Sequence, residues 1–208
     1  MSHVASTVET SKSWTRDGFF ISTDTSLVPI PVLNKAFESE EIYWAKGLPE
    51  PVMQEMLDNS VCFGLYSPTP SPPPPTTVAA LDASAAFDSA DILHEIATPV
   101  QTTTTTTFQE AKAELNLIGF ARAITDRVTF FYLTDVYVLP AWQGRGLGNW
   151  LVSCVQEVVE DMPYLRRSML VIGHDRESRM GFYKRLMKME PLGDPAMVLN
   201  WKGPGCAF

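Results

Sequence analysis

Three alternate glycines in the segment Val138–Trp150, which reads VLPAWQGRGLGNW, carry the clearest chemical meaning in this sequence. An apolar, β-branched run over Val128–Leu139 precedes them, and a helical pattern over Leu147–Met162 follows. A strand, a glycine-rich turn and a helix in this order gather unpaired backbone N–H groups at the positive end of the helix. Such a concavity suits phosphate or pyrophosphate, and Arg145 adds a fixed positive charge. An ordinary tight turn before a helix is the plain alternative.

A dinucleotide-binding loop of the Rossmann type fits this segment poorly. Its G-x-G-x-x-G pattern would need a glycine at position 149, where the chain has Asn149. It also needs an acidic residue about 20 positions further on, and Tyr164 and Leu165 occupy that region.

The elements that must position the glycine turn do not alternate strictly between strand and helix. The turn Asp126-Arg127 joins two long strands that precede it. Apolar spacing and β-branched runs predict, in order, a strand over Asp17–Thr23, helices over Pro31–Glu40 and Pro49–Asn59, strands over Val61–Tyr66, Leu115–Thr125 and Thr129–Leu139, a helix over Leu147–Met162, a strand over Arg167–Gly173, a helix over Glu177–Met187 and a strand over Ala196–Trp201. This order predicts an α/β protein with a mixed, mostly antiparallel sheet flanked by helices, not a doubly wound fold.

The chain is expected to form a single domain over residues 14–208, since 208 residues can bury one good core. Residues 1–13 are polar and are predicted to form a disordered tail. Residues 67–112 are predicted to be a flexible insertion at a hairpin tip, because they contain the proline run at 72–75 and an unbroken threonine tract at 102–107. A regulatory or partner-binding role for this insertion is less favoured than a tolerated, solvent-exposed expansion.

Composition narrows the function classes. The net charge is −8 and no basic stripe is present, which argues against nucleic-acid binding and weakly favours cationic substrates such as amines. The three cysteines, Cys62, Cys154 and Cys206, are widely spaced and match neither a disulfide framework nor a metal site. No apolar leader or membrane-spanning run is visible. We therefore expect a soluble cytoplasmic protein, compatible with nuclear access, that binds no metal and no membrane and is a monomer or homodimer.

The glycine turn resembles the acetyl-CoA pyrophosphate loop of the GNAT N-acetyltransferase superfamily. Its pattern, Gln/Arg-x-x-Gly-x-Gly/Ala, is matched by Gln143, Gly146 and Gly148 after the strand DVYVLP. The order of elements is also that of the superfamily. Further stretches resemble a subgroup of small GNAT enzymes: ISTD (21–24), YWAKG (43–47), NSVCFGLY (59–66), GFARAITD (119–126) and LTDVYVLP (133–140).

The resemblance implies a GNAT acyl-CoA N-acyltransferase fold with acetyl-CoA as co-substrate. Backbone groups of Val136 and Val138 would pair with the pantetheine arm, although both side chains also suit simple core packing. The strand that carries them would splay from the strand at Arg167–Gly173 and leave a cleft for cofactor and amine. The residues implied to hold the pyrophosphate through their amides are Gln143, Gly144, Arg145, Gly146, Leu147 and Gly148.

The resemblance also points to catalytic groups. Tyr183 lies where the family commonly has its tyrosine acid, and a tyrosine with an ordinary pKa near 10 is protonated at neutral pH; a half-buried structural aromatic is the alternative. Some family members place a glutamate or histidine at the position of Tyr132 or Thr134, and this chain has neither. Asp135 is the nearest carboxylate. We predict that it acts as the general base, with ordered water relaying the proton from the amine to it. The competing interpretation is that the Asp135 carboxylate only accepts hydrogen bonds from neighbouring amides and has a structural role.

The acceptor pocket is expected around Tyr43 and Trp44, between the two early helices, together with Phe120 and Arg122. Core packing is an equally good interpretation of the aromatic residues. Arg122 needs a partner within its apolar strand, which could be Asp135 or a carboxylate of the substrate.

The leading functional prediction is an acetyl-CoA-dependent N-acetyltransferase that acetylates a primary amine of a small molecule by direct attack in a ternary complex. A protein N-terminal or lysine acetyltransferase is the alternative within enzymes. A non-catalytic acyl-CoA-binding module is the alternative from another class.

Overall fold

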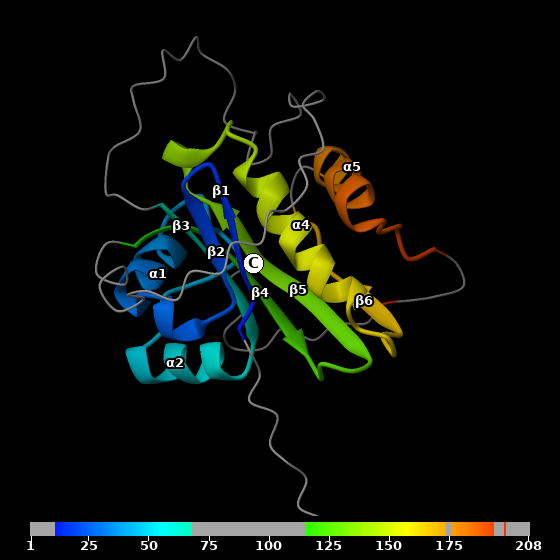
Figure 1. Cartoon of the computed structure of the whole chain (residues 1–208), viewed down its shortest axis with the longest axis horizontal. Helices are drawn as coiled ribbons and strands as arrows, with labels where there is room; N and C mark the ends of the chain where they lie inside the picture. Colours follow the sequence, from blue (N-terminus) through cyan, green and yellow to red (C-terminus); the bar gives the residue numbers. More distant parts are fainter. Residues whose placement is uncertain (1–10, 68–114, 174–175, 194–197, 199–208) are drawn as a thin grey trace, which may run out of the picture.

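The structure is a computed structural model that describes residues 11–67, 115–173, 176–193 and 198. Within these residues one six-stranded sheet has the order β1-β2-β3-β4-β5-β6 (Figure 1). Neighbouring strands are antiparallel except β5 and β6, which are parallel. The mixed, mostly antiparallel sheet predicted from the sequence is therefore confirmed. The strands are β1 (Ser13–Arg16), β2 (Phe19–Ser22), β3 (Val61–Ser67), β4 (Asn116–Thr125), β5 (Phe130–Val138) and β6 (Arg167–Met169).

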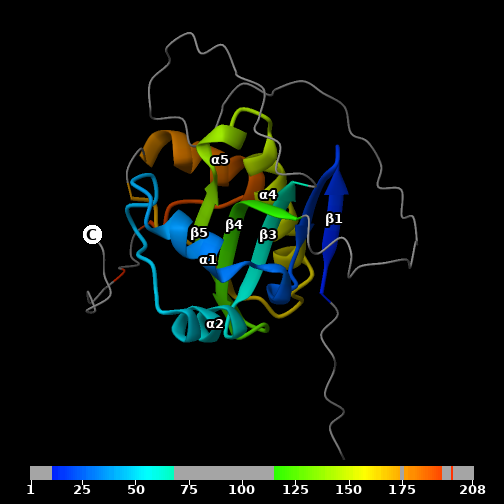
Figure 2. The same cartoon turned by 90° about the vertical axis from the view of Figure 1, so that its left-hand side faces the viewer.

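Helices cover both faces of the sheet (Figures 1 and 2). Helices α1 (Ile30–Phe37) and α2 (Glu50–Asp58) pack on one face, and α4 (Leu147–Glu160) and α5 (Arg176–Met187) pack on the other. Short 3-10 turns, η1 (Thr25–Leu27) and η3 (Pro140–Trp142), precede α1 and the glycine turn. Two buried apolar clusters result, because the sheet separates the side chains of α1 and α2 from those of α4 and α5.

The first two strands form a hairpin that the sequence analysis did not predict. Asp17 (φ 51°) and Gly18 (φ 81°) make the tight turn, as expected for an Asp-Gly pair, which adopts the left-handed region readily. The single strand predicted over Asp17–Thr23 is therefore wrong at its start, and Ser13, assigned to the tail, begins β1. The remainder of the proposed tail up to residue 10 lies outside the described residues.

The hairpin is fastened along helix α4. Lys12 makes an ion pair with Asp161 near the end of the helix. Two residues on, the Trp14 indole N–H donates to a carboxylate oxygen of Glu157 at 2.7 Å. Residues two apart on a strand face the same side, so Arg16 continues this row toward the start of α4. The hairpin thereby reaches the glycine turn.

The predicted insertion leaves and re-enters the sheet at adjacent points. Ser67 is the last residue of β3 and pairs with Asn116 of β4. Residues 68–114, which contain nearly all of the predicted insertion, lie outside the described residues, as does the strand predicted over Ala196–Trp201 apart from Val198. The insertion remains a prediction.

Asp126 holds the β4–β5 connection. Its Oδ1 accepts the backbone N–H groups of Val128, Thr129 and Phe130, and its Oδ2 accepts the Thr129 hydroxyl. These hydrogen bonds hold the pKa of the Asp126 carboxyl well below its usual range. The connection is longer than the predicted two-residue turn, because β5 begins only at Phe130.

A bulge interrupts β5 at Asp135. Phe120 pairs with Tyr137, but Arg122 pairs with Thr134, so β5 contains one extra residue between these pairs. Asp135 has φ 52°, and aspartate tolerates this region better than most residues. The bulge switches the facing of the strand.

The packing on the two sides of the sheet shows that the bulge changes which side chains of β5 face which helices. Leu133 packs with α4 and α5, whereas Tyr137, an even number of residues later, packs with α1 and α2. Strict alternation, which would put Val136 on the face of Tyr132 and Thr134, is therefore broken in this strand. Val136 packs on the same side as Leu133.

Candidate active site

The glycine turn has left-handed backbone angles directly before helix α4. Gly144 has φ 73° and Gly146, which caps the start of α4, has φ 68°. A side chain in this region costs about 1–2 kcal/mol per residue. The first N–H groups of α4 have no intrahelical acceptors. The turn therefore presents donors at the positive end of a helix dipole, which fits a diphosphate.

Two arginines flank this turn, each stacked on a tryptophan. The guanidinium carbon of Arg145 lies 5.1 Å from the ring centre of Trp142, and that of Arg16 lies 5.0 Å from the ring centre of Trp150. Arg16 also donates from Nη2 to the carbonyl of Gly146 at 3.3 Å. Sequence reasoning found Arg145 and missed Arg16. The Asp-Gly pair that follows Arg16 was the available signal.

Among the described residues, the side of β5 that faces β6 is open beyond the first few residues. Within that part of the chain, β6 pairs with β5 only from Phe130 to Tyr132. The Leu139 N–H donates to Ile118 of β4 at 2.8 Å, so the backbone groups of the preceding Val138 point the opposite way. Those of Val136 face the same open side. Gln143 already donates from Nε2 to the Val138 carbonyl at 2.8 Å, which ties the glycine turn to this edge.

A cavity of about 220 Å³ occupies the opening between β5 and the chain that follows β6. Its walls include Tyr132 and Thr134 from β5, Tyr183 from α5, and Tyr43 and Trp44 from the segment between α1 and α2. The Tyr43 and Trp44 rings meet edge to face, with centres 5.1 Å apart. The structure thus brings together the predicted aromatic pair, the predicted acid and the bulged strand.

A smaller cavity of about 50 Å³ continues along β5 toward Gln143. Three residues line both cavities: Trp44, Val136 and Arg179. The two cavities therefore meet at these side chains. Sequence analysis did not select Arg179, since nothing in the pattern of α5 marks which of its arginines faces the sheet.

Tyr183 is suited to donate a proton. Its side chain is only 8% exposed, and burial raises the pKa of its hydroxyl to about 12, with the Arg179 charge acting in the opposite direction. The hydroxyl therefore stays protonated at neutral pH. Tyr132, on the same cavity wall, also has a raised pKa, first because of burial and then because of the Asp135 charge.

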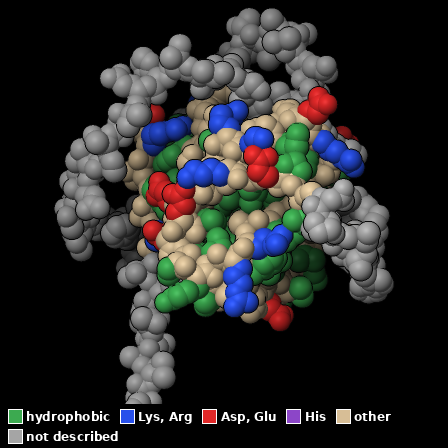
Figure 3. All heavy atoms as spheres, turned by 90° about the vertical axis from the view of Figure 1, so that its right-hand side faces the viewer, with side chains coloured by type: hydrophobic (Ala, Val, Ile, Leu, Met, Phe, Trp, Pro, Cys, Tyr) green, Lys and Arg blue, Asp and Glu red, His purple; other side chains and the backbone are tan. Residues whose placement is uncertain are grey.

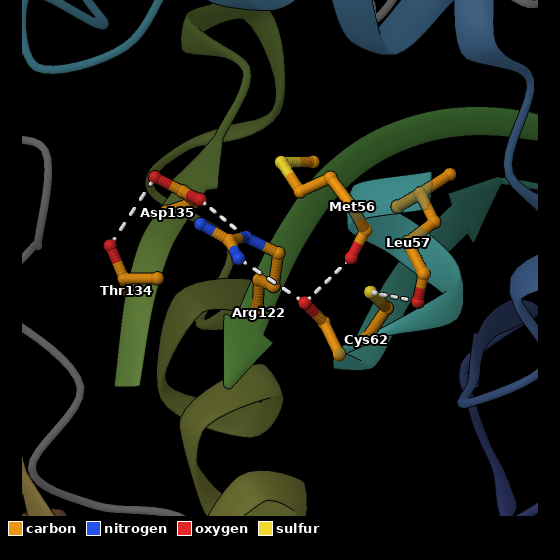
Figure 4. A network of polar contacts seen from close by, with 7 residues as sticks. Met56, Leu57, Cys62, Arg122, Thr134 and Asp135 are labelled. Atoms are coloured by element: carbon orange, nitrogen blue, oxygen red, sulfur yellow. Dashed lines mark hydrogen bonds and ion pairs between the residues drawn. The ribbon is translucent and has the colours of Figure 1, made fainter. Parts of the chain in front are cut away.

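Asp135 takes part in a buried polar network (Figure 4). Its Oδ2 accepts from Arg122 Nε at 2.7 Å and its Oδ1 accepts from the Thr134 hydroxyl at 3.3 Å. Arg122 Nη1 donates onward to Ser60 Oγ at 3.2 Å, and Ser60 donates to the carbonyl of Met56 in α2. Arg122 therefore has Asp135 as its partner, one of the two options predicted. The network joins the bulge to the end of α2.

Two of the predicted substrate residues lie elsewhere. Phe120 is fully buried in the cluster with α1 and α2, where its ring contacts Tyr137. Arg122 turns to Asp135 and Ser60 and does not line the cavity. For Arg122 the bulge accounts for the difference, because it carries the Asp135 side chain, which also lines the cavity, toward the α2 face, where it holds Arg122. Burial raises the pKa of the Cys62 thiol, which lies beside this network, to about 12, so the thiol stays protonated at neutral pH.

The side of the molecule that carries β6 and α5 has apolar side chains at its centre with both basic and acidic side chains around them (Figure 3). A hollow of about 600 Å³ lies there between the two elements, and Tyr183 borders both this hollow and the 220 Å³ cavity. Among the described residues, no group of histidine, cysteine, aspartate or glutamate is placed to hold a metal ion. In the same part of the chain, every helix is too short or too polar to cross a bilayer.

Strand β5 thus parts from its parallel neighbour β6, with the glycine turn at its end and Tyr183 in the gap, which is the arrangement that the resemblance to the GNAT superfamily implied. Comparison with known proteins identifies the family. The sequence profile of the Acetyltransferase (GNAT) family matches residues 77–188. A proposed acetyltransferase of Gibberella zeae is 33% identical over 160 residues, which cover 77% of this chain and 75% of the relative. The chain therefore belongs to the GNAT family of acetyltransferases.

Solved structures agree in fold. A proposed GNAT acetyltransferase from Xanthomonas campestris pv. campestris is 25% identical with a TM-score of 0.56, and the match covers 90% of this chain and 94% of that one. A protein of unknown function from Staphylococcus aureus, described as a probable acetyltransferase, has a TM-score of 0.50 at 14% identity, over 89% and 99% of the two chains. The second match supports the fold alone. The family prediction made from the sequence is confirmed.

Proposed function

We propose that this acetyltransferase transfers the acetyl group of acetyl-CoA to a primary amine of a small molecule, by direct attack in a ternary complex. The observation that carries the proposal is the 220 Å³ cavity at the opening of β5, walled by Tyr43, Trp44 and Tyr183. A cavity of this size accommodates a small amine and leaves little room for an extended peptide.

The residues at the end of β5 fit acetyl-CoA. The left-handed Gly144 and Gly146 allow close approach of the diphosphate to the amides of residues 143–148. Arg145 and Arg16 supply two positive charges beside them. The open backbone edge at Val136 and Val138 offers hydrogen bonds to the amide groups of the pantetheine arm, although the Val138 carbonyl already accepts from Gln143. Acetyl-CoA supplies an acetyl group activated as a thioester.

Few side chains carry the roles that acetyl transfer needs. Tyr183 holds a proton at its hydroxyl for the departing thiolate, because burial keeps that hydroxyl neutral. Tyr43 and Trp44 exclude water and orient the body of the amine. The role of Asp135 as a general base that receives the proton through water stays a prediction. Its ion pair with Arg122 favours a positioning role at the bulge.

The alternatives lead to different measurements. A protein N-terminal or lysine acetyltransferase would prefer peptides, and a non-catalytic module would bind acetyl-CoA without turnover. A screen that detects free thiol release from acetyl-CoA, run over small amines, amino acids, aminosugars, polyamines and peptides, separates all three. We expect release with a small amine, and a Tyr183→Phe variant should lose most of this turnover while its acetyl-CoA affinity stays within about threefold.

Cofactor binding itself is measured by thermal unfolding. Acetyl-CoA at a hundred times its Kd contributes about 2.7 kcal/mol, which corresponds to a rise in Tm of roughly 5–10 °C for a chain of this size. An unchanged Tm at saturating acetyl-CoA would contradict the proposal. Release with peptides alone would replace the small-molecule acceptor by a protein.

A further inference from the structure

Arg179 occupies the point where the cofactor track and the acceptor cavity meet. It lines the 220 Å³ cavity together with Tyr183, and it lines the 50 Å³ cavity that runs along β5 to Gln143. A reaction between a thioester that arrives along β5 and an amine in the larger cavity must take place where the two cavities join. Arg179 is the one cationic side chain among the described residues that line both.

Two neighbours fix the position of this arginine. Its guanidinium carbon lies 6.0 Å from the ring centre of Trp44, within the range of a cation–π contact. Arg179 also precedes Tyr183 by four residues on α5, so the two side chains lie on the same face of the helix. Arg179 is half-buried, and its charge acts on the Tyr183 hydroxyl.

We propose that Arg179 is a further catalytic residue, whose guanidinium contacts the reacting group and stabilises the negative charge that develops on the departing thiolate of CoA. This inference rests on the proposed function, because it requires acetyl-CoA in the track along β5. A fixed cation in a site shielded from water stabilises such a charge more strongly than solvent does.

Transfer of the acetyl group from the CoA sulfur to the amine needs no other reactant. The lone pair of the neutral amine forms the N–C bond to the acetyl carbon, the C–S bond breaks, and its electron pair moves to sulfur beside Arg179. The Tyr183 hydroxyl gives its proton to the thiolate. The resulting tyrosinate, held next to Arg179, takes up the proton that the acylated nitrogen loses, so the products are a neutral amide and a neutral thiol.

An equilibrium measurement tests this role without any acceptor. Calorimetry between pH 7 and 9.5 compares CoA, which has a thiol, with desulfo-CoA, which lacks it. If Arg179 stabilises the thiolate, CoA should gain about tenfold in affinity over desulfo-CoA across this range in the wild type. The gain should vanish in Arg179→Met and persist in part in Arg179→Lys, which keeps a charge.

Arg185 provides a matched control. It lies on the same helix, its guanidinium carbon is 6.0 Å from the ring centre of Phe182, and it lines none of the cavities described. Arg185→Met should behave as the wild type. With an active acceptor, Arg179→Met should lower kcat by about a hundredfold, as the loss of a transition-state donor does.

The outcomes separate the two proposals. A wild type without pH-dependent preference for CoA, or an Arg179→Met variant that keeps it, would overturn the role of Arg179. A normal preference for CoA combined with no thiol release in the whole acceptor screen would support Arg179 and contradict the small-molecule function.

Discussion

The ion pair between Arg122 and Asp135 allows a quantitative prediction of stability. Asp135→Asn removes the charge but keeps the shape, and asparagine tolerates the positive φ of this position about as well as aspartate. The Arg122 and Asp135 side chains are 14% and 8% exposed, so the pair is close to the buried limit. Loss of one partner of such a pair costs about 3–5 kcal/mol, because the remaining charge stays buried without compensation.

We expect about 3 kcal/mol for Asp135→Asn, the lower end of that range, since Arg122 retains some contact with solvent and its bond to Ser60. For a chain of this size the Tm should fall by roughly 6–12 °C. The double variant Asp135→Asn/Arg122→Met should recover at least half of the loss, because neither charge then remains. Urea unfolding measures all three free energies.

Asp17→Asn is the matched control. Asp17 has the same backbone conformation, with φ 51° against 52° for Asp135, but its side chain is 84% exposed. The same substitution there should change the free energy of unfolding by less than about 0.5 kcal/mol. Equal losses at Asp17 and Asp135, or a double variant that is no more stable than Asp135→Asn, would refute the reasoning.

Three other expectations follow from the structure. Gly146→Asp adds a side chain and a negative charge at a left-handed cap, so acetyl-CoA affinity should fall below detection by calorimetry; unchanged affinity would place the diphosphate elsewhere. Burial raises the pKa of the Cys62 and Cys154 thiols to about 12 in the folded protein, so as the pH rises these thiols ionise first in the unfolded chain. The free energy of unfolding should therefore be highest below pH 8.5, the ordinary thiol pKa, and should fall toward pH 12, which urea unfolding would record. A maleimide should label neither thiol quickly at pH 8. Replacement of residues 68–114 by a short Gly-Ser bridge should leave Tm within a few degrees, and an insoluble product would contradict a dispensable insertion.

The sequence predicted the long elements because their apolar residues repeat with the period of the element. Helix α4 and strand β4 start and end within two residues of the prediction. The glycine turn was also predictable, since glycine marks the left-handed positions directly. Strand β1 was missed because Trp14 is its only apolar residue, and only the Asp17-Gly18 turn signals the hairpin.

The composition of the acceptor site was less predictable because it depends on packing between distant segments. A bulge at a non-glycine residue leaves no mark in the sequence, so the sequence could not show that Asp135 would hold Arg122 away from the pocket. Arg179 enters the site only through its contact with Trp44, which is 135 positions away in the chain. Spacing within α5 does not encode that contact.

The extra residue in β5 also decides which changes of length the strand can accept. Deletion of one residue between Thr134 and Tyr137 would restore a regular ladder in which Arg122 still pairs with Thr134 and Phe120 still pairs with Tyr137, so both halves of the strand would keep their faces. Deletion of one residue between Phe130 and Thr134 would instead turn the residues on one side of the gap to the opposite face of the sheet. A library of single-codon deletions should therefore contain folded variants from the bulge more often than from the first half of β5.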